Sequence, residues 1–176
     1  MLGSKTKKNL EEAFAGESMA RNKYDYFASV ARKAGYEQIA NFFTETALNE
    51  KEHAKIWAKQ LGLISVNPAD VLKAAMAGEH YETSEMYPRM AKEALEEGNE
   101  AVAKLFTEVA AIEKAHEERY QKLLANLEQG TVFKQPIVKK WKCLNCGAIY
   151  EGTEPPKVCP ACSHPQGYFE IWVEAY

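Results

Sequence analysis

The first 142 residues of this 176-residue chain contain no cysteine, which excludes a disulfide scaffold in that part. No stretch approaches the ~18 consecutive apolar residues of a membrane span. The lysine-rich segment 1–9 is not followed by the apolar core of a signal peptide. Charges of both signs are interspersed and the formal net charge is only −3, so we expect neither a nucleic acid nor a membrane as partner. These absences predict a soluble, cytoplasmic protein.

Helical periodicity dominates the first 130 residues and predicts four helices, over about residues 5–33, 36–61, 68–97 and 99–128. Each is expected to end at a glycine: Gly35, Gly62, Gly98 and Gly130. Asn67 and Pro68 suit the cap and first turn of the third helix. Pro88 lies within that helix and should kink it, freeing a carbonyl near Ser84. Segment 63–67 is either a crossover or a hinge for exchange between subunits.

Two of these helices carry a Glu-x-x-His motif on the line of their apolar residues. In the second helix the line is Ile39, Phe43, Thr46, Glu50, His53 and Trp57. In the fourth it is Val102, Phe106, Val109, Glu113, His116, Tyr120, Leu123 and Leu127. Such positions face the core of a helix bundle. An unpaired carboxylate there costs several kcal/mol, so it must be neutralised, paired or bound to a metal.

Similar carboxylates on the other two helices extend this set. The candidate metal ligands are Glu17, Glu50, His53, Glu79, Glu82, Glu113 and His116. Glu17 precedes Glu50 by 33 residues and Glu79 precedes Glu113 by 34, which suggests two helix hairpins that each supply half of one site. Ferritin-like di-iron and di-manganese proteins use this ligand pattern.

Blander interpretations of the same residues remain open. A single Glu-x-x-His is ordinary on a solvated helix, and Glu79 and Glu82 could be surface residues beside Glu85. The shared register with core residues favours the metal site. His80 is adjacent to Glu79 but rotated by about 100° around the helix, so we expect it at the surface or just outside the ligands.

All four cysteines lie near the C-terminus in two C-x-x-C pairs: Cys143, Cys146, Cys159 and Cys162. They predict a tetrahedral four-thiolate site for zinc or iron. Spacing alone slightly favours zinc, whereas a neighbouring di-metal site favours iron as a one-electron donor. Gly147 allows a positive φ after the first pair, and Ser163 takes the matching place at a cost of roughly 1 kcal/mol. Segment 142–176 is too short to fold without a metal. The predicted domains are 1–135 and 136–176.

The whole chain resembles the rubrerythrin family, in which a ferritin-like di-iron domain precedes a rubredoxin-like domain. The resemblance rests on Glu50-Lys-Glu-His53, on Glu79-His-Tyr-Glu82 with the Tyr87-Pro88 that follows, on Glu113-Lys-Ala-His116, and on the two cysteine pairs. The twelve residues between those pairs are few for a rubredoxin and are similar to this family. Ser163 departs from the usual glycine. The implied fold is mainly α, a ferritin-like four-helix bundle with a small, β-rich, four-cysteine metal domain.

The resemblance implies a non-haem peroxidase that reduces hydrogen peroxide to water and protects against oxidative stress. Its cofactors would be two iron ions in the bundle and one in the cysteine site, where zinc substitutes in some preparations. One iron would be bound by Glu17, Glu50, Glu82 and Glu113, with His53 replacing Glu82 on reduction. The other would be bound by Glu50, Glu79, Glu113 and His116.

The family also implies roles for residues around the irons and for partners. Tyr24 and Tyr87 match tyrosines next to the irons, although from the sequence alone they would pass for core aromatics. A head-to-tail homodimer and an external donor, such as rubredoxin or an NAD(P)H-dependent reductase, would supply electrons. The main alternative is a ferroxidase or iron-handling ferritin-like protein, which has no use for a four-cysteine centre. A third interpretation is a non-enzymatic electron carrier. The additional candidate ligand Glu82 argues against it.

Overall fold

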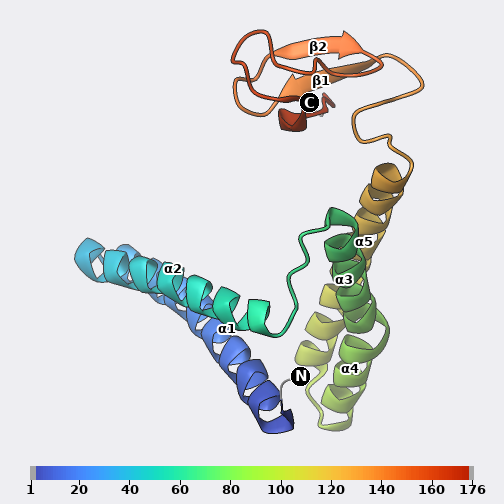
Figure 1. The fold of residues 1–176 in the computed structure, drawn as a ribbon. Helices are drawn as coiled ribbons and strands as arrows, with labels where there is room; N and C mark the ends of the chain where they lie inside the picture. The colour runs from blue at the N-terminus through green and yellow to red at the C-terminus, as the bar shows by residue number, and fades with distance from the viewer. Residues whose placement is uncertain (1–2, 175–176) are drawn as a thin grey trace. The chain divides into compact units, whose positions relative to one another are not determined.

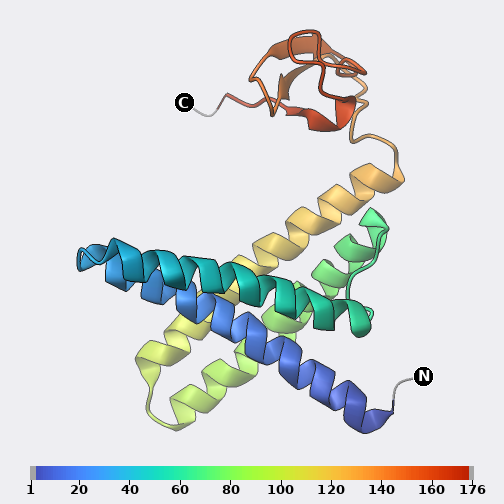
Figure 2. The same ribbon diagram turned by 60° about the vertical axis from the view of Figure 1, so that its left-hand side comes forward.

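The computed structural model describes residues 3–174, and the chain divides into two compact units between Val66 and Asn67. Figures 1 and 2 show the helices and the small C-terminal sheet from two directions. Each unit is described by itself below. Among the described residues, none of the helices has both the length and the apolar character needed to cross a membrane.

The first unit is a pair of long helices, α1 (Ser4–Lys33) and α2 (Glu37–Gln60), joined by a tight turn at Gly35. Their buried residues are all alanines: Ala28, Ala31, Ala40, Ala47, Ala54 and Ala58. Small side chains let two helix backbones approach closely. The predicted apolar line of α2 runs beside this alanine seam rather than along it, so Phe43, Glu50 and Trp57 are only half-buried in the unit.

The second unit begins with a helical stretch that packs along one long helix. Its parts are α3 (Pro68–Tyr81), the π-helical turn η1 (Glu82–Met86) and α4 (Tyr87–Glu96), and all three contact α5 (Glu100–Glu128). The predicted cap at the start of α3 is confirmed, because Asn67 Oδ1 accepts a hydrogen bond from the Ala69 N–H at 2.9 Å. The predicted ends at Gly98 and Gly130 are confirmed as well.

The predicted third helix differs from the structure at its centre. We expected one helix kinked by Pro88, whereas the chain inserts the π-turn η1 immediately before α4. The Tyr87 N–H donates to the carbonyl of Glu82, five residues back rather than four. A π-turn widens the helix locally and absorbs one extra residue. The proline is thereby placed in the first turn of α4, where its missing N–H costs little.

The C-terminal segment forms a small antiparallel sheet around the cysteines. Its strands are β1 (Lys139–Cys143), β2 (Ile149–Gly152) and β3 (Phe169–Ile171), in the order β2-β1-β3, with the 3-10 turn η2 (Gln166–Tyr168) before β3. Trp141, fully buried, packs with Cys143, Cys159 and Phe169. Its indole Nε1 donates to the carbonyl of Gly152 at 3.0 Å. The core of this segment is therefore built partly from cysteine thiols.

Candidate metal centres

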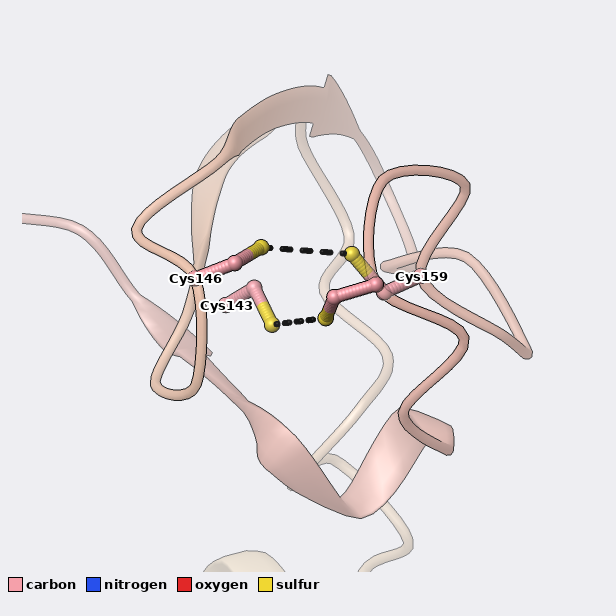
Figure 3. A group of neighbouring side chains, drawn as sticks. Cys143, Cys146 and Cys159 are labelled. Atoms are coloured by element: carbon pink, nitrogen blue, oxygen red, sulfur yellow. Dashed lines mark hydrogen bonds between the residues drawn. The ribbon is translucent and has the colours of Figure 1, made fainter.

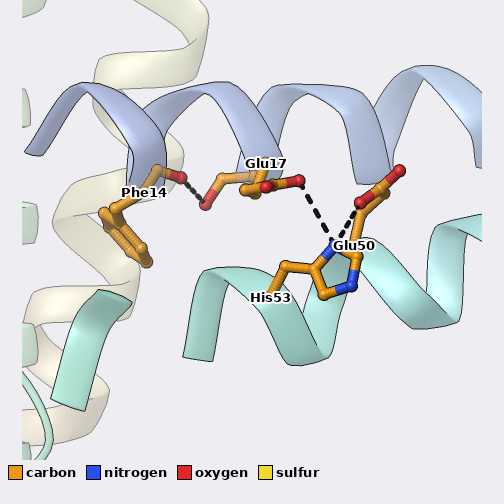
Figure 4. Close-up of polar contacts among 5 residues, drawn as sticks. Phe14, Glu17, Glu50 and His53 are labelled. Carbon is orange, nitrogen blue, oxygen red and sulfur yellow. Dashed lines mark hydrogen bonds and ion pairs between the residues drawn. The ribbon is translucent and has the colours of Figure 1, made fainter. Parts of the chain in front are cut away.

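The first unit brings three of the predicted ligands together. Glu17 on α1 and the Glu50–His53 pair on α2 offer ligand atoms that lie within 4.8 Å of one another. Figure 4 shows the imidazole of His53 facing both carboxylates, with Nδ1 2.7 Å from Glu50 Oε2 and 3.7 Å from Glu17 Oε2. Both carboxylates are half-buried, whereas the His53 side chain is 51% exposed. We call these three residues the first triad.

The second unit repeats this arrangement with a second set. Glu79 on α3 meets Glu113 and His116 on α5, again with ligand atoms within 4.8 Å of one another. His116 Nδ1 lies 2.7 Å from Glu113 Oε2 and 3.8 Å from Glu79 Oε2. We call these residues the second triad. The predicted echo between two helix hairpins is thus present in the side-chain geometry of each unit.

The carboxylates of the second triad repel one another when no cation lies between them. The pKa of Glu79 is raised by burial, then by the charge of Glu113 and by a hydrogen bond with it, with a further contribution from Glu82, whereas His116 opposes the shift. Burial and the charges of Glu82, Glu113 and Glu79 also raise the pKa of Tyr87. Oxygen and imidazole donors crowded in this way suit divalent iron, manganese or zinc. The donor set therefore fits a metal ion.

The other candidates from the sequence, Glu82, Tyr24 and Tyr87, fall outside both triads. Glu82 is half-buried at the start of η1 and falls outside both triads. The Tyr24 ring stacks on Phe43 at 6.0 Å, and the Tyr87 ring lies 6.0 Å from Phe106. The contribution of Glu82 to the pKa shifts of Glu79 and Tyr87 indicates that it lies near both. Its role as a ligand stays a prediction.

His80 lies at the surface of the second unit, as the helix geometry indicated. Its side chain is 62% exposed, and Nδ1 lies 3.0 Å from Oε1 of Glu117 on α5. One contact next to the triad was missed by the sequence reasoning: Thr83 Oγ1 donates to the carbonyl of Ala110 at 2.6 Å. A threonine five residues before Pro88 gives no sequence signal of a bond to another helix.

The four cysteines converge at the end of the sheet and are all free thiols. The Sγ atoms of Cys143 and Cys162 are 3.7 Å apart, as are those of Cys146 and Cys159 (Figure 3). Cys143 and Cys159 are buried, whereas Cys146 is exposed. Four sulfurs at these separations surround a position suited to one tetrahedral zinc or iron ion.

The thiols of Cys146 and Cys159 have pKa values shifted in opposite directions. Burial alone would raise the pKa of Cys159, but the backbone N–H groups of Cys162 and Ala161, together with neighbouring thiols, lower it to about 6. For Cys146 the Ala148 N–H acts in the opposite direction, yet hydrogen bonds with the other thiols and burial raise its pKa to about 12. A thiolate at Cys159 near neutral pH gives an incoming metal its first ligand.

The two turns after the cysteine pairs have the same left-handed backbone. Gly147 has φ 78° and Ser163 has φ 60°, so the serine adopts the conformation that the sequence comparison of the two pairs predicted. In each turn the N–H of this residue donates to the carbonyl of the first cysteine of its pair, at 2.8 Å. Among the described residues, Ser163 is the one non-glycine residue with a positive φ.

Comparisons with known proteins match both parts of the chain to described families. The family described as "Rubrerythrin" matches residues 8–124, and "Rubrerythrin, rubredoxin-like domain" matches residues 141–170.

Individual relatives match over nearly the whole chain. Rubrerythrin-1 of Clostridium acetobutylicum is 49% identical over 100% of this chain and 98% of that protein. Rubrerythrin of Nitratidesulfovibrio vulgaris is 44% identical over 97% of this chain and 96% of that protein. A solved structure of partially reduced nigerythrin is 33% identical and covers 98% of this chain and 88% of that one, with a TM-score of 0.37. The fold class is mainly α with a small C-terminal metal domain, and the chain belongs to the rubrerythrin family.

Proposed function

We propose that this protein is a di-iron peroxidase that reduces hydrogen peroxide to water with electrons relayed through the four-cysteine iron. The observation that carries the proposal is the presence, in one chain, of two carboxylate–histidine triads and a four-thiolate cluster. A metal pair alone would serve iron storage equally well. A four-thiolate iron adds a one-electron donor, which a peroxidase needs between turnovers.

The proposed ligand sets draw on both triads and on Glu82. Glu17, Glu50, Glu82 and Glu113 would hold one iron, and Glu50, Glu79, Glu113 and His116 the other, with Glu50 and Glu113 bridging. His53 would replace Glu82 in the reduced state, because a neutral imidazole suits the lower charge of ferrous iron. The surplus of one carboxylate over the common ferritin-like pattern supports this exchange. When bound, the two ferrous ions supply the two electrons that cleave the O–O bond.

The residues around the ligands would manage protons. The pKa of Tyr87 is raised by burial and by three carboxylates, so its hydroxyl keeps its proton at neutral pH and can donate it to a leaving oxygen. Tyr24 would have the matching place in the first unit, where it packs on Phe43. Both tyrosines can orient substrate by hydrogen bonds while their rings exclude water.

The remaining parts of the proposal concern assembly and surroundings. We propose a head-to-tail homodimer, which would place one chain's cysteine-bound iron beside its partner's helices, and an external donor such as rubredoxin or an NAD(P)H-dependent reductase. The four free thiols within metal-binding distance support a reducing compartment, the cytoplasm.

The test compares two oxidants on the reduced protein. Iron-loaded protein, with its metals counted by elemental analysis, is reduced anaerobically and mixed with hydrogen peroxide or with oxygen. We expect peroxide to oxidise the di-iron centre much faster. A matched Cys146→Ser, Cys162→Ser variant should keep this single oxidation and lose steady-state turnover with an external donor. Faster oxidation by oxygen than by peroxide would favour the ferroxidase alternative and reject the proposal.

A further inference from the structure

The π-turn η1 sets the backbone of one proposed ligand. Glu82 is its first residue, and its carbonyl accepts the N–H of Tyr87. A π-turn is rare and occurs mostly as a single turn within an α-helix, frequently at a functional site, so we expect contacts outside the turn to hold it. In this chain it lies against α5, next to the second triad.

Thr83 forms a contact that can hold this turn. Its hydroxyl donates to the carbonyl of Ala110 on α5 at 2.6 Å, across 27 residues of sequence, and the group is partly buried. Five other hydroxyls in helical segments instead donate to the carbonyl four residues back along the chain: those of Ser18, Thr44, Thr46, Ser84 and Thr107. Those bonds are local and connect no neighbouring helix, whereas the Thr83 bond joins η1 to α5.

The anchor point lies on the ligand-bearing side of α5. Ala110 precedes Glu113 by three residues, so the two share a helix face. One turn earlier on α3, His80 contacts Glu117 at 3.0 Å. The exposed His80 pair is worth little by itself. Thr83 is the partly buried contact, and it directly follows Glu82.

We propose that Thr83 is a positioning residue for the di-iron site: its bond to Ala110 fixes the π-turn, so that Glu82 joins or leaves iron by rotating its side chain alone. This rests on the function proposed above, because it assumes that Glu82 binds the oxidised iron. With the backbone fixed, Glu82 meets ferric iron without a cost for ordering the turn. Without the bond, the ferric state loses affinity relative to the ferrous state.

The test replaces Thr83 by valine, which keeps the shape and removes the hydroxyl. Thr83→Ser keeps the hydroxyl, and Thr107→Val is the matched control, because Thr107 bonds only to its own helix at Ala103. The measurement is an EPR-monitored redox titration of iron-loaded protein, with metal counts and unfolding temperatures alongside. If Thr83→Val weakens ferric binding about tenfold, the potential of one iron rises by about 59 mV. Thr83→Ser and Thr107→Val should stay at the wild-type value.

Other outcomes decide against the proposal. An unchanged potential in Thr83→Val with both irons bound overturns it, and so does an equal rise in Thr107→Val. If Thr83→Val fails to fold or to bind two irons, Thr83→Ala replaces it; metal loss in both, with Thr107→Val fully loaded, also counts against it. Peroxide reactivity of the wild-type protein separates the two claims. A shifted potential in a protein inert to peroxide would keep the role of Thr83 and reject the peroxidase function.

Discussion

Nδ1 of His116 lies 2.7 Å from Oε2 of Glu113, one turn earlier on the same helix. The same distance separates these atoms in the Glu50–His53 pair of the first unit. A motif with i, i+3 spacing brings its two side chains together through helix geometry alone. The contact to the other helix of each unit is matched as well: Glu17 lies 3.7 Å from the ring nitrogen of His53, and Glu79 lies 3.8 Å from that of His116.

The two histidines should nevertheless behave differently on substitution. His116→Ala removes a permanent ligand in the proposed scheme, so it should weaken iron binding by at least the 10–100-fold that loss of a supporting group costs. His53→Ala should leave both irons in the oxidised protein and slow peroxide turnover, because only the reduced state uses His53. Elemental analysis and stopped-flow oxidation measure the two effects.

His80→Ala is the matched control for both histidine variants. It removes an exposed imidazole next to Glu79 and outside both triads, so its iron content and turnover should equal those of the wild type. Unchanged peroxide turnover in His53→Ala would contradict the exchange of His53 for Glu82.

Glu79→Gln should have opposite effects on the metal-free and the metal-loaded protein. The folded-state pKa of Glu79 is raised from its ordinary 4.5 by burial and then by the charge of Glu113. The stability that its proton contributes is therefore full below the unfolded pKa and is lost as pH rises through the folded pKa. Near neutral pH a neutral glutamine should raise the unfolding temperature of the metal-free protein, and this gain should shrink toward pH 4.5.

With iron bound, the sign of the Glu79 effect reverses, because a ligand is lost. The control is Glu96→Gln, which removes the same charge from an exposed pair with Lys92. Thermal unfolding of both forms across this pH range measures the effect. A lower unfolding temperature of metal-free Glu79→Gln at neutral pH would show that burial and the charge of Glu113 do not outweigh the favourable interaction of charged Glu79 with His116.

The site could be predicted from the sequence where a short motif is compatible with only a few local geometries. Glu-x-x-His on a helix leaves little choice of geometry, and four cysteines in two C-x-x-C pairs leave one arrangement for a metal. Ser163 could be assigned a left-handed backbone because its counterpart Gly147 fixes the shape of the turn. Each of these predictions depends on local geometry, which short sequence spacing encodes.

Features that depend on several helices at once were harder to predict. In the π-turn before Pro88, a hydrogen bond spans five residues instead of the four of an α-helix. In our proposal this pattern depends on the contact of Thr83 with α5. The buried seam of the first unit consists of alanines, whereas periodicity pointed to larger apolar residues beside it. The alanines and the larger apolar residues of α2 recur with the same helical period, so the pattern cannot show which of the two sets faces α1.

The two cysteine turns offer a reciprocal pair of substitutions. Ser163→Gly should stabilise the metal-loaded C-terminal segment by about 1 kcal/mol, because glycine adopts φ 60° without the cost of a Cβ. Gly147→Ser should destabilise it by about the same amount. A Cβ at Gly147 meets no atom within 4 Å, so the effect would be conformational rather than steric.

Gly167→Ala serves as the control for these turn variants. Its φ is not positive and its added Cβ also meets nothing within 4 Å, so it should change little. Resistance of the bound metal to a chelator at increasing temperature reports all three variants. A Ser163→Gly protein no more resistant than the wild type would mean that Ser163 recovers its conformational cost elsewhere in the turn.

Removal of the cysteine-bound metal should unfold the C-terminal segment and leave the helices intact. Two of the four described core residues there, Cys143 and Cys159, belong to the four-thiol cluster that we expect to bind the metal. Structural zinc sites in small domains contribute about 10–16 kcal/mol of apparent binding free energy, far more than a segment of this size gains from apolar burial.

The indole proton of Trp141 reports this unfolding directly, because it is fully buried and donates to Gly152 at 3.0 Å. In NMR hydrogen exchange it should be protected in the loaded protein and exchange rapidly after chelation. The indole Nε1 of Trp57, on α2, is buried, so its exchange should not change on chelation, and the helical circular dichroism should persist. Persistent protection of Trp141 without metal would show that Trp141 and Phe169 hold the sheet together by themselves, so that the metal serves electron transfer alone.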